Sequence, residues 1–458
     1  MSASAGPGAR ALRSTRVFLD GAFRPAAIVI EGERIADVLG HAEPGPGLAL
    51  DDLGHVPLLP GLVDPHVHIN EPGRTDWEGF VTATRAAAAG GVTTLVDMPL
   101  NCIPVTTSAG ALETKLAAAR GRLAVDVGFW GGVVPGNAGE LAAMVARGAL
   151  GAKCFLCHSG IDDFPASSPD DLRKAMPALR EAGAPLLVHA ELERAQAPAC
   201  AGDVRSYATY LASRPRDWED DAVALMVELC RETGCPVHIV HLSSSGALEA
   251  LRRAKDEGLP FSAETCPHYL CLSAEEIAEG ATEFKCAPPI REAENRDKLW
   301  AAVASGLIDL VTSDHSPCTP HLKKPAEGDF CGAWGGIASL SLGLPSVHTA
   351  ALARGVSLER LLVTMTTAPA KLAGLDRRKG RLARGFDADL CAFDPEARWQ
   401  VQADALPFRH KVSPYVGREL RGRVLSTWLR GTPVYGAGAR PDAAPGRALL
   451  GRNADRIV

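Results

Sequence analysis

Two histidines separated by a single residue occur early in the chain, in the segment DPHVH at residues 64–68. Side chains alternate across an extended strand, so His66 and His68 point to the same side. Two imidazoles on one side can supply half of a metal site. A purely structural pair would have the same spacing, so the interpretation depends on which other ligands the fold brings to them.

Further candidate ligands end three later apolar runs of the sequence. They are His189, His241 and Asp314. Taken alone, each histidine could be a core residue with a hydrogen-bonded ring, and Asp314 could be a helix cap or a turn residue. His238 lies three residues before His241, so strand alternation places the two on opposite faces, and we interpret His238 as structural.

Lys153 lies inside the apolar run at residues 152–156, where an unpaired ammonium group is unfavourable. Its side chain could extend to the rim of the fold or pair with Asp314. If burial deprotonates the amine, the lysine can instead add carbon dioxide. The resulting carbamate would be a bidentate oxygen ligand.

These residues together suggest a site for two divalent cations. His66 and His68 would hold the first ion. His189 and His241 would hold the second, and the lysine carbamate would bridge the two. Asp314 would bind the first ion and act as the base toward its bound water.

The candidate ligands can meet only if their elements share one end of a fold. Between about residue 60 and residue 315, short β-branched or apolar runs alternate with stretches of helical composition, as in βα units. The strand candidates are residues 62–69, 93–98, 125–131, 152–156, 185–189, 236–242, 260–266 and 307–313. Eight such units predict an α/β fold of the (β/α)8 barrel type, with catalytic groups at the carboxyl ends of the strands. A doubly wound sheet is the alternative, but no glycine-rich phosphate turn follows the first strand.

The two chain ends differ from the barrel region. Before residue 60 and after residue 379, short alternating runs are separated by Gly, Pro and Asp turns. We therefore expect a catalytic barrel at residues 60–379 and a small β-sandwich domain built from residues 1–59 and 380–435. Residues 436–458 are rich in Gly, Ala, Pro and Arg, which predicts a flexible tail.

Composition limits the partners that the protein can have. The net charge of -6 argues against nucleic acid. Residues 1–16 lack the apolar segment of a secretory signal, and polar residues and proline interrupt the uncharged stretch 331–353. We expect a cytoplasmic protein without membrane contact. Its 12 cysteines are scattered, and we interpret them as reduced, mostly buried thiols.

The candidate ligands also lie in motifs of a known family. PGLVDPHVH at 60–68 and SDHSP at 313–317, together with Lys153 and the two later histidines, resemble the cyclic amidohydrolases. That group includes dihydroorotases, hydantoinases and allantoinases. GRL at 380–382 and GFDADL at 385–390 are similar to the family's return into its small β domain. The resemblance covers almost the whole chain.

The resemblance implies two divalent metal ions, an N-carboxylated lysine at position 153 and a homodimer or homotetramer. Zinc is the first expectation, and cobalt, manganese or iron are the alternatives, because His/carboxylate sites accept all four. All six positions that match the family's ligands are filled. This disfavours a non-catalytic amidohydrolase-like scaffold, which is the alternative from another functional class.

Further segments indicate which enzymes of this group the chain resembles most. Dihydroorotases carry an arginine and commonly a histidine where this chain has Asn70 and Cys318. The segments 68–80, 97–101 and 333–337 are similar to allantoinases, whereas hydantoinases and dihydropyrimidinases usually differ there and are the alternative. The resemblance therefore implies hydrolysis of a cyclic ureide, the opening of the hydantoin ring of allantoin to give allantoate.

Substrate contacts are expected from loops at the barrel mouth. A cyclic ureide offers N–H and C=O groups, which backbone atoms recognise well where glycine or proline fixes the loop. The resemblance suggests Ala287 and Gly335 for such contacts. Ser159 and Asn70 could add side-chain hydrogen bonds, although each could equally cap a loop.

Overall fold

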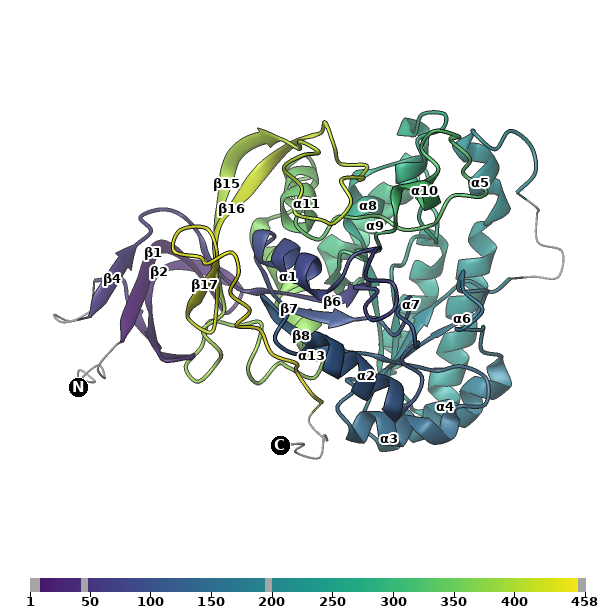
Figure 1. The fold of residues 1–458 in the computed structure, drawn as a ribbon, viewed down its shortest axis with the longest axis horizontal. Coiled ribbons are helices and arrows are strands. Elements are labelled where there is room, and N and C mark those ends of the chain that lie inside the picture. The colour runs from purple at the N-terminus through teal and green to yellow at the C-terminus, as the bar shows by residue number, and fades with distance from the viewer. Residues whose placement is uncertain (1–8, 43–47, 194–199, 452–458) are drawn as a thin grey trace.

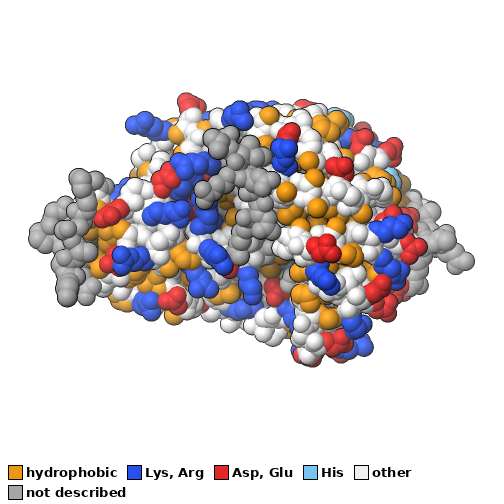
Figure 2. All heavy atoms as spheres, turned by 90° about the horizontal axis from the view of Figure 1, so that it is seen from below, with side chains coloured by type: hydrophobic (Ala, Val, Ile, Leu, Met, Phe, Trp, Pro, Cys, Tyr) orange, Lys and Arg blue, Asp and Glu red, His pale blue; other side chains and the backbone are white. Residues whose placement is uncertain are grey.

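The computed structural model describes residues 9–42, 48–193 and 200–451. Figure 1 shows a β domain beside a larger α/β body. Within the described ranges, no helix combines the length and the apolar character needed to cross a membrane. On the face seen in Figure 2, Lys and Arg side chains are interspersed with Asp and Glu.

All eight predicted barrel strands are present, and they run parallel. They are β6 (Leu62–Val67), β7 (Val92–Asp97), β8 (Asp126–Phe129) continued by β9 (Gly131–Gly132), β10 (Ala152–Phe155), β11 (Leu186–His189), β12 (Val237–Ile239), β13 (Phe261–Thr265) and β14 (Leu310–Val311). The hydrogen-bonded orders are β6-β7-β8 and β9-β10-β11-β12-β13-β14. A parallel bridge between Val67 and His315 joins the first strand to the segment after the last. The predicted barrel is therefore confirmed.

Helices surround the strands and fill most of the connections between them. They are α1 (Phe80–Ala89), α2 (Ala109–Ala119), α3 (Leu141–Ala146), α4 (Pro169–Glu181), α5 (Tyr207–Ser213), α6 (Arg216–Thr233), α7 (Leu248–Asp256), α8 (Pro267–Cys271), α9 (Ala293–Ser305), α10 (Pro320–Lys323), α11 (Gly343–Leu352), α12 (Leu358–Met365) and α13 (Thr367–Leu372). Local sequence explains where several begin. Ser108 accepts a hydrogen bond from the third residue of α2, and Ser168 and Asp171 form a reciprocal capping box at the start of α4.

The two chain ends form one β domain, as predicted. Its strands are β1 (Arg10–Leu19), β2 (Ala22–Glu31), β3 (Arg34–Gly40), β4 (Ala49–Asp52), β5 (Leu58–Pro60), β15 (Leu390–Gln400), β16 (Glu419–Leu429) and β17 (Thr432–Tyr435). They belong to one hydrogen-bonded sheet of order β17-β16-β15-β5-β1-β2-β3, with β4 on β1. Buried side chains such as Leu12, Ile28 and Leu390 form its core. A larger apolar core lies between the barrel strands and their helices.

Residues 446–451 differ from the expected flexible tail. The amide of Val127 donates to the carbonyl of Arg447 at 3.0 Å, and the amide of Leu449 donates to the carbonyl of Val127 at 2.8 Å. Leu449 is buried in an apolar cluster. Backbone groups at the edge of β8 need hydrogen-bond partners, and this segment supplies them. It does so although its composition is typical of a loop. Residues 452–458 lie outside the described part.

A buried lysine connects the barrel to the β domain. The Nζ atom of Lys379 lies 2.7 Å from Asp126 on β8, 2.7 Å from Asp389 and 2.9 Å from Asp387. Burial alone would lower the pKa of Lys379, but the three carboxylates outweigh it and raise that pKa. The lysine is therefore held as a cation that neutralises carboxylates from both parts of the fold.

Replacing Lys379 with methionine should lower the free energy of unfolding by about 3–5 kcal/mol, because the buried carboxylates lose their shared cation. Urea unfolding measures this change. Lys298→Met is the control, because it removes an exposed lysine that lies 2.7 Å from Glu294. It should change stability by no more than about 1 kcal/mol. Equal effects of the two substitutions would contradict the role of Lys379.

Candidate metal centre and active site

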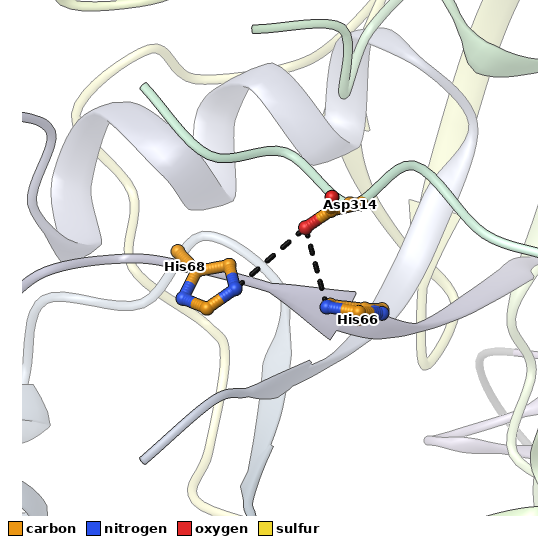
Figure 3. Close-up of side chains that lie close together, drawn as sticks. All are labelled: His66, His68 and Asp314. Atoms are coloured by element: carbon orange, nitrogen blue, oxygen red, sulfur yellow. Dashed lines mark ion pairs between the residues drawn. The ribbon is translucent and has the colours of Figure 1, made fainter. Parts of the chain in front are cut away.

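Closure of the barrel brings Asp314 to the first histidine pair. The amide of His68, just after β6, donates to the carbonyl of His315 at 2.8 Å, so the segment after β14 runs beside the end of β6. The Oδ1 atom of Asp314 then lies 3.2 Å from Nε2 of His66 and 3.6 Å from Nε2 of His68 (Figure 3). The two histidines face the same side, as strand alternation predicts. Three of the predicted ligands therefore converge.

The other three predicted ligands lie beside this group. His189 ends β11 and His241 follows β12, and their Nδ1 and Nε2 atoms are 3.0 Å apart. Lys153 on β10 places its Nζ atom 3.3 Å from Nε2 of His66. The rings of His66 and His241 have centroids 5.2 Å apart. All six side chains are buried together at one end of the barrel.

Three of the four histidines have their outer ring nitrogen fixed by an acceptor. Glu264 on β13 accepts from Nδ1 of His66, a backbone carbonyl accepts from Nδ1 of His68 at 2.8 Å, and Glu191 accepts from Nε2 of His189 at 2.7 Å. Since carboxylates and carbonyls only accept, these nitrogens carry the hydrogen. The inner nitrogens therefore present lone pairs toward the centre, as metal ligands require.

Burial also keeps these imidazoles neutral. It lowers the pKa of His66 to about 4, with a further contribution from the Lys153 charge. It lowers the pKa of His68, His189 and His241 as well. Neutral imidazole is the form that binds a metal. The Nδ1 atom of His241 has no hydrogen-bond partner within the described residues, so no protein acceptor fixes its tautomer.

Lys153 and Asp314 are shifted in opposite directions. Burial lowers the pKa of Lys153 to about 8, which makes the free amine needed for carbamate formation accessible near neutral pH. Burial raises the pKa of Asp314 to about 8, so its carboxylate form needs positive charge nearby. Two divalent cations could be bound by the inward lone pairs of the histidines, a buried carboxyl group and a lysine that can lose its proton. The residues present therefore fit such a centre.

A cavity of about 430 Å³ opens onto these residues. Of the predicted substrate contacts, Ser159, Ala287 and Gly335 line it. The hydroxyl of Ser159 donates to the carbonyl of Phe164 at 2.6 Å, so it already forms a hydrogen bond within its own loop.

Asn70 is not among the residues that line this cavity, contrary to the expectation of a substrate contact there. Its amide nitrogen donates to the carbonyl of Pro317 at 3.2 Å, and its amide oxygen accepts from Asn101 at 3.4 Å. Asn101 faces the cavity in its place. Asn70 therefore lies behind the wall and supports it.

Sequence reasoning did not identify several residues that the structure places at the site. Glu264 and Glu191 hold two of the histidines, and Arg214 and Lys285 line the cavity. Glu264 interrupts an apolar strand, as Lys153 does, and that signal could have revealed it. The other three lie on connections between strands, where spacing carries no periodic signal.

The family is settled by comparison with known proteins. The model of the Amidohydrolase family matches residues 58–434. This chain belongs to that family. An allantoinase of Streptomyces avermitilis is 49% identical over 428 residues, which cover 93% of this amidohydrolase and 95% of that protein. An allantoinase of Saccharomyces cerevisiae is 44% identical, with 93% and 95% covered.

Solved structures agree with the fold of this amidohydrolase. An L-hydantoinase (dihydropyrimidinase) from Arthrobacter aurescens superposes with a TM-score of 0.89 at 31% identity, over 96% of this chain and 99% of that one. A dihydropyrimidinase from Brevibacillus agri gives a TM-score of 0.86 at 27% identity, over 98% and 100% of the chains. The barrel and the β domain therefore follow the family arrangement.

A disulfide at the cavity corrects the expectation that every cysteine is reduced. Cys200 and Cys331 are bonded, with their Cα atoms 5.8 Å apart, and both line the cavity of the amidohydrolase. They are 131 residues apart in sequence, so no local spacing identified the pair. The bond links the segment after Glu191 to the loop that carries Gly335.

Thiol titration of the amidohydrolase in denaturant without reductant should count 10 thiols per chain, because the other two of its 12 cysteines are bonded. After reduction the count should rise to 12. A Cys200→Ser variant is the control and should show the same count before and after reduction. Twelve reactive thiols in the unreduced protein would contradict the disulfide.

Proposed function

We propose that this amidohydrolase is an allantoinase, which hydrolyses the hydantoin ring of allantoin to give allantoate in purine and ureide catabolism. The observation that carries the proposal is the convergence of six buried candidate ligands, five of which line a cavity sized for a small molecule. Relatives named allantoinases, which match almost end to end, support this choice of substrate. A cytoplasmic location and a homodimer or homotetramer belong to the same proposal.

The proposed centre holds two divalent cations, zinc in the first instance, with cobalt, manganese or iron as alternatives. His66, His68 and Asp314 would hold one ion. His189 and His241 would hold the other. An N-carboxylated Lys153 would bridge them, and its amine, whose pKa burial lowers to about 8, is suited to form the carbamate.

The reaction adds water across a cyclic amide bond. When bound, the two cations supply a water of lowered pKa and a polarised carbonyl. Asp314 accepts a proton from the attacking water at its carboxylate and donates it to the ring nitrogen as the C–N bond breaks. The hydroxyl stays on the former carbonyl carbon, so the product is a carboxylic acid. Backbone groups near Ala287 and Gly335 would orient the ureide.

A substrate panel tests the choice of allantoin. The metal-loaded protein should give its highest kcat/KM on allantoin when it is compared with hydantoin, dihydrouracil and dihydroorotate. Hydantoinase is the second candidate, because hydantoinases and dihydropyrimidinases are among the structures that superpose well. A preference for unsubstituted hydantoin over allantoin would favour that candidate and overturn the allantoinase proposal.

Asp314→Asn should reduce kcat at least about 100-fold, because general acid–base catalysis by one residue contributes about 10²–10⁴-fold. The amide keeps the shape of the side chain, so the fold and most of the bound metal should remain. Steady-state kinetics and elemental analysis measure the two effects. Wild-type turnover in the variant would exclude Asp314 as the proton carrier.

Lys153→Ala should lose both metal and activity, because the bridging carbamate cannot form. Acetate or propionate should restore part of each, since a short carboxylate can occupy the place of the carbamate. Elemental analysis and turnover with and without the acid give the result. A variant that is fully active without added acid would contradict the bridge.

A further inference from the structure

Glu191 is a buried carboxylate that the reaction above does not use. It follows β11 and lies two residues after His189, and its side chain is completely buried. Its Oε2 atom is 2.7 Å from Nε2 of His189. The opposite ring nitrogen of His189, Nδ1, faces Nε2 of His241 at 3.0 Å. The carboxylate therefore touches the outer side of a candidate ligand and not the cavity side.

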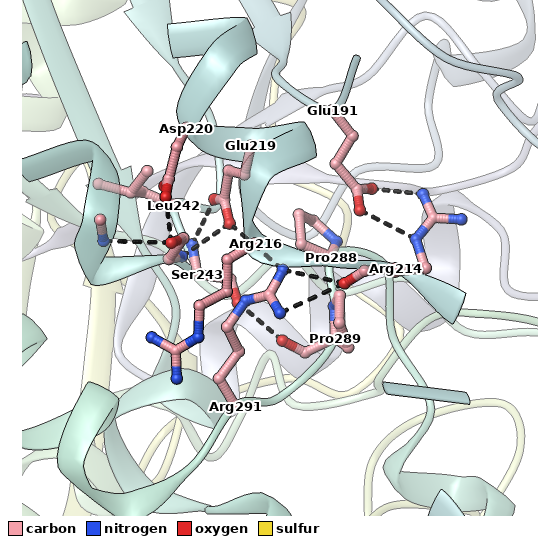
Figure 4. Close-up of polar contacts among 12 residues, drawn as sticks. Glu191, Arg214, Arg216, Glu219, Asp220, Leu242, Ser243, Pro288, Pro289 and Arg291 are labelled. Atoms are coloured by element: carbon pink, nitrogen blue, oxygen red, sulfur yellow. Dashed lines mark hydrogen bonds and ion pairs between the residues drawn. The ribbon is translucent and has the colours of Figure 1, made fainter. Parts of the chain in front are cut away.

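Arg214 fixes this carboxylate. The arginine lies in the connection between α5 and α6. Both oxygens of Glu191 accept hydrogen bonds from its guanidinium group (Figure 4). The Nε atom of Arg214 lies 2.9 Å from Oε1, and its Nη2 atom donates to Oε2. Two parallel hydrogen bonds of this kind fix orientation as well as position. Burial alone would raise the pKa of Glu191, but the Arg214 charge and the His189 contact lower it below its usual range.

Arg214 is itself anchored by a second buried pair. Its backbone carbonyl accepts from both terminal nitrogens of Arg291, each at 3.3 Å. Arg291 lies 4.0 Å from Glu219 on α6, and Glu219 accepts from the amides of Ser243 and Ser244 at 2.7 Å each (Figure 4). The polar network therefore extends from Glu191 to the turn just after His241, and it leaves Glu191 little freedom to move.

We propose that Glu191 and Arg214 are positioning residues for the second cation, a role that rests on the proposed binuclear centre. Glu191 accepts the Nε2 hydrogen of His189, so the lone pair of this imidazole is on Nδ1, which faces His241. If the carboxylate were absent, the hydrogen could move to Nδ1 and block coordination. His66 and His68 have acceptors of their own, so the first cation does not depend on Glu191.

A structural role and a positioning role predict different results. A buried Glu–Arg pair that served only stability would lower the melting temperature when broken and leave the relative affinities of the two ions unchanged. If the pair instead orients His189, breaking it should weaken the binding of one ion selectively. Outer hydrogen-bond partners of metal-ligating histidines typically contribute about 10–100-fold to metal affinity. Metal binding therefore separates the two roles without any measurement of catalysis.

The test is Glu191→Leu in the full-length chain, because leucine removes the acceptor that a glutamine amide would retain. The variant is titrated with Zn²⁺ in buffers of defined free metal and followed by elemental analysis and calorimetry. One of the two ions should bind about 10–100-fold more weakly, and the other should bind as in the wild type. Asp126→Asn is the control. Asp126 on β8 is equally buried and accepts from an arginine, Arg430, but it contacts no imidazole and lies outside the network of Glu191 and Arg214. This control should bind both ions normally.

Wild-type binding of both ions to the Glu191 variant, or equal weakening of both, would overturn the positioning role. If that variant does not fold, Arg214→Lys keeps a positive charge but removes the paired hydrogen bonds, and it should weaken the same single ion by a smaller factor. An unchanged affinity there would also overturn the role. A wild-type protein that binds two ions but does not hydrolyse allantoin would refute the proposed substrate and leave this inference standing.

Discussion

The site depends on the closure of the barrel between its first strand and the segment after its last. The bridge between Val67 and His315 sets that register, and the hydrogen bond from the His68 amide to the His315 carbonyl extends it. This pairing places Asp314 opposite His66 and His68. The other strands add their ligands at the same end because parallel strands of a barrel share one carboxyl edge.

Burial then determines the chemistry of the converged groups. Removal from water keeps the four imidazoles neutral, brings Lys153 toward its free amine and opposes ionisation of Asp314. Each shift favours a bound cation, which would accept the imidazole lone pairs and stabilise the carboxylate. Glu264 and Glu191 complete the arrangement, because each carboxylate fixes the outer nitrogen of one histidine. The polar groups at the barrel end therefore act as one unit.

Sequence patterns were sufficient to predict the strands and the convergence of the six candidate ligands, because short apolar runs define the strands and these six residues lie in the runs or directly after them. Periodicity failed where contacts between distant segments determine the position of a residue. Asn70 carries a polar group next to the HxH motif, yet Asn101 occupies the cavity wall in front of it. The Cys200–Cys331 bond and the pairing of residues 446–451 with β8 join distant segments. Arg214 lies in a connection between helices, where no pattern distinguishes a contact to Glu191 from a solvated arginine.

Six side chains are proposed to bind a pair of cations, and anomalous diffraction from metal-loaded crystals tests this arrangement most directly. Two peaks about 3.5–4 Å apart should appear, one beside His66, His68 and Asp314 and the other beside His189 and His241. Continuous density on the Lys153 amine should lie between them. A single peak, or an unmodified amine at Lys153 in fully loaded protein, would contradict the account.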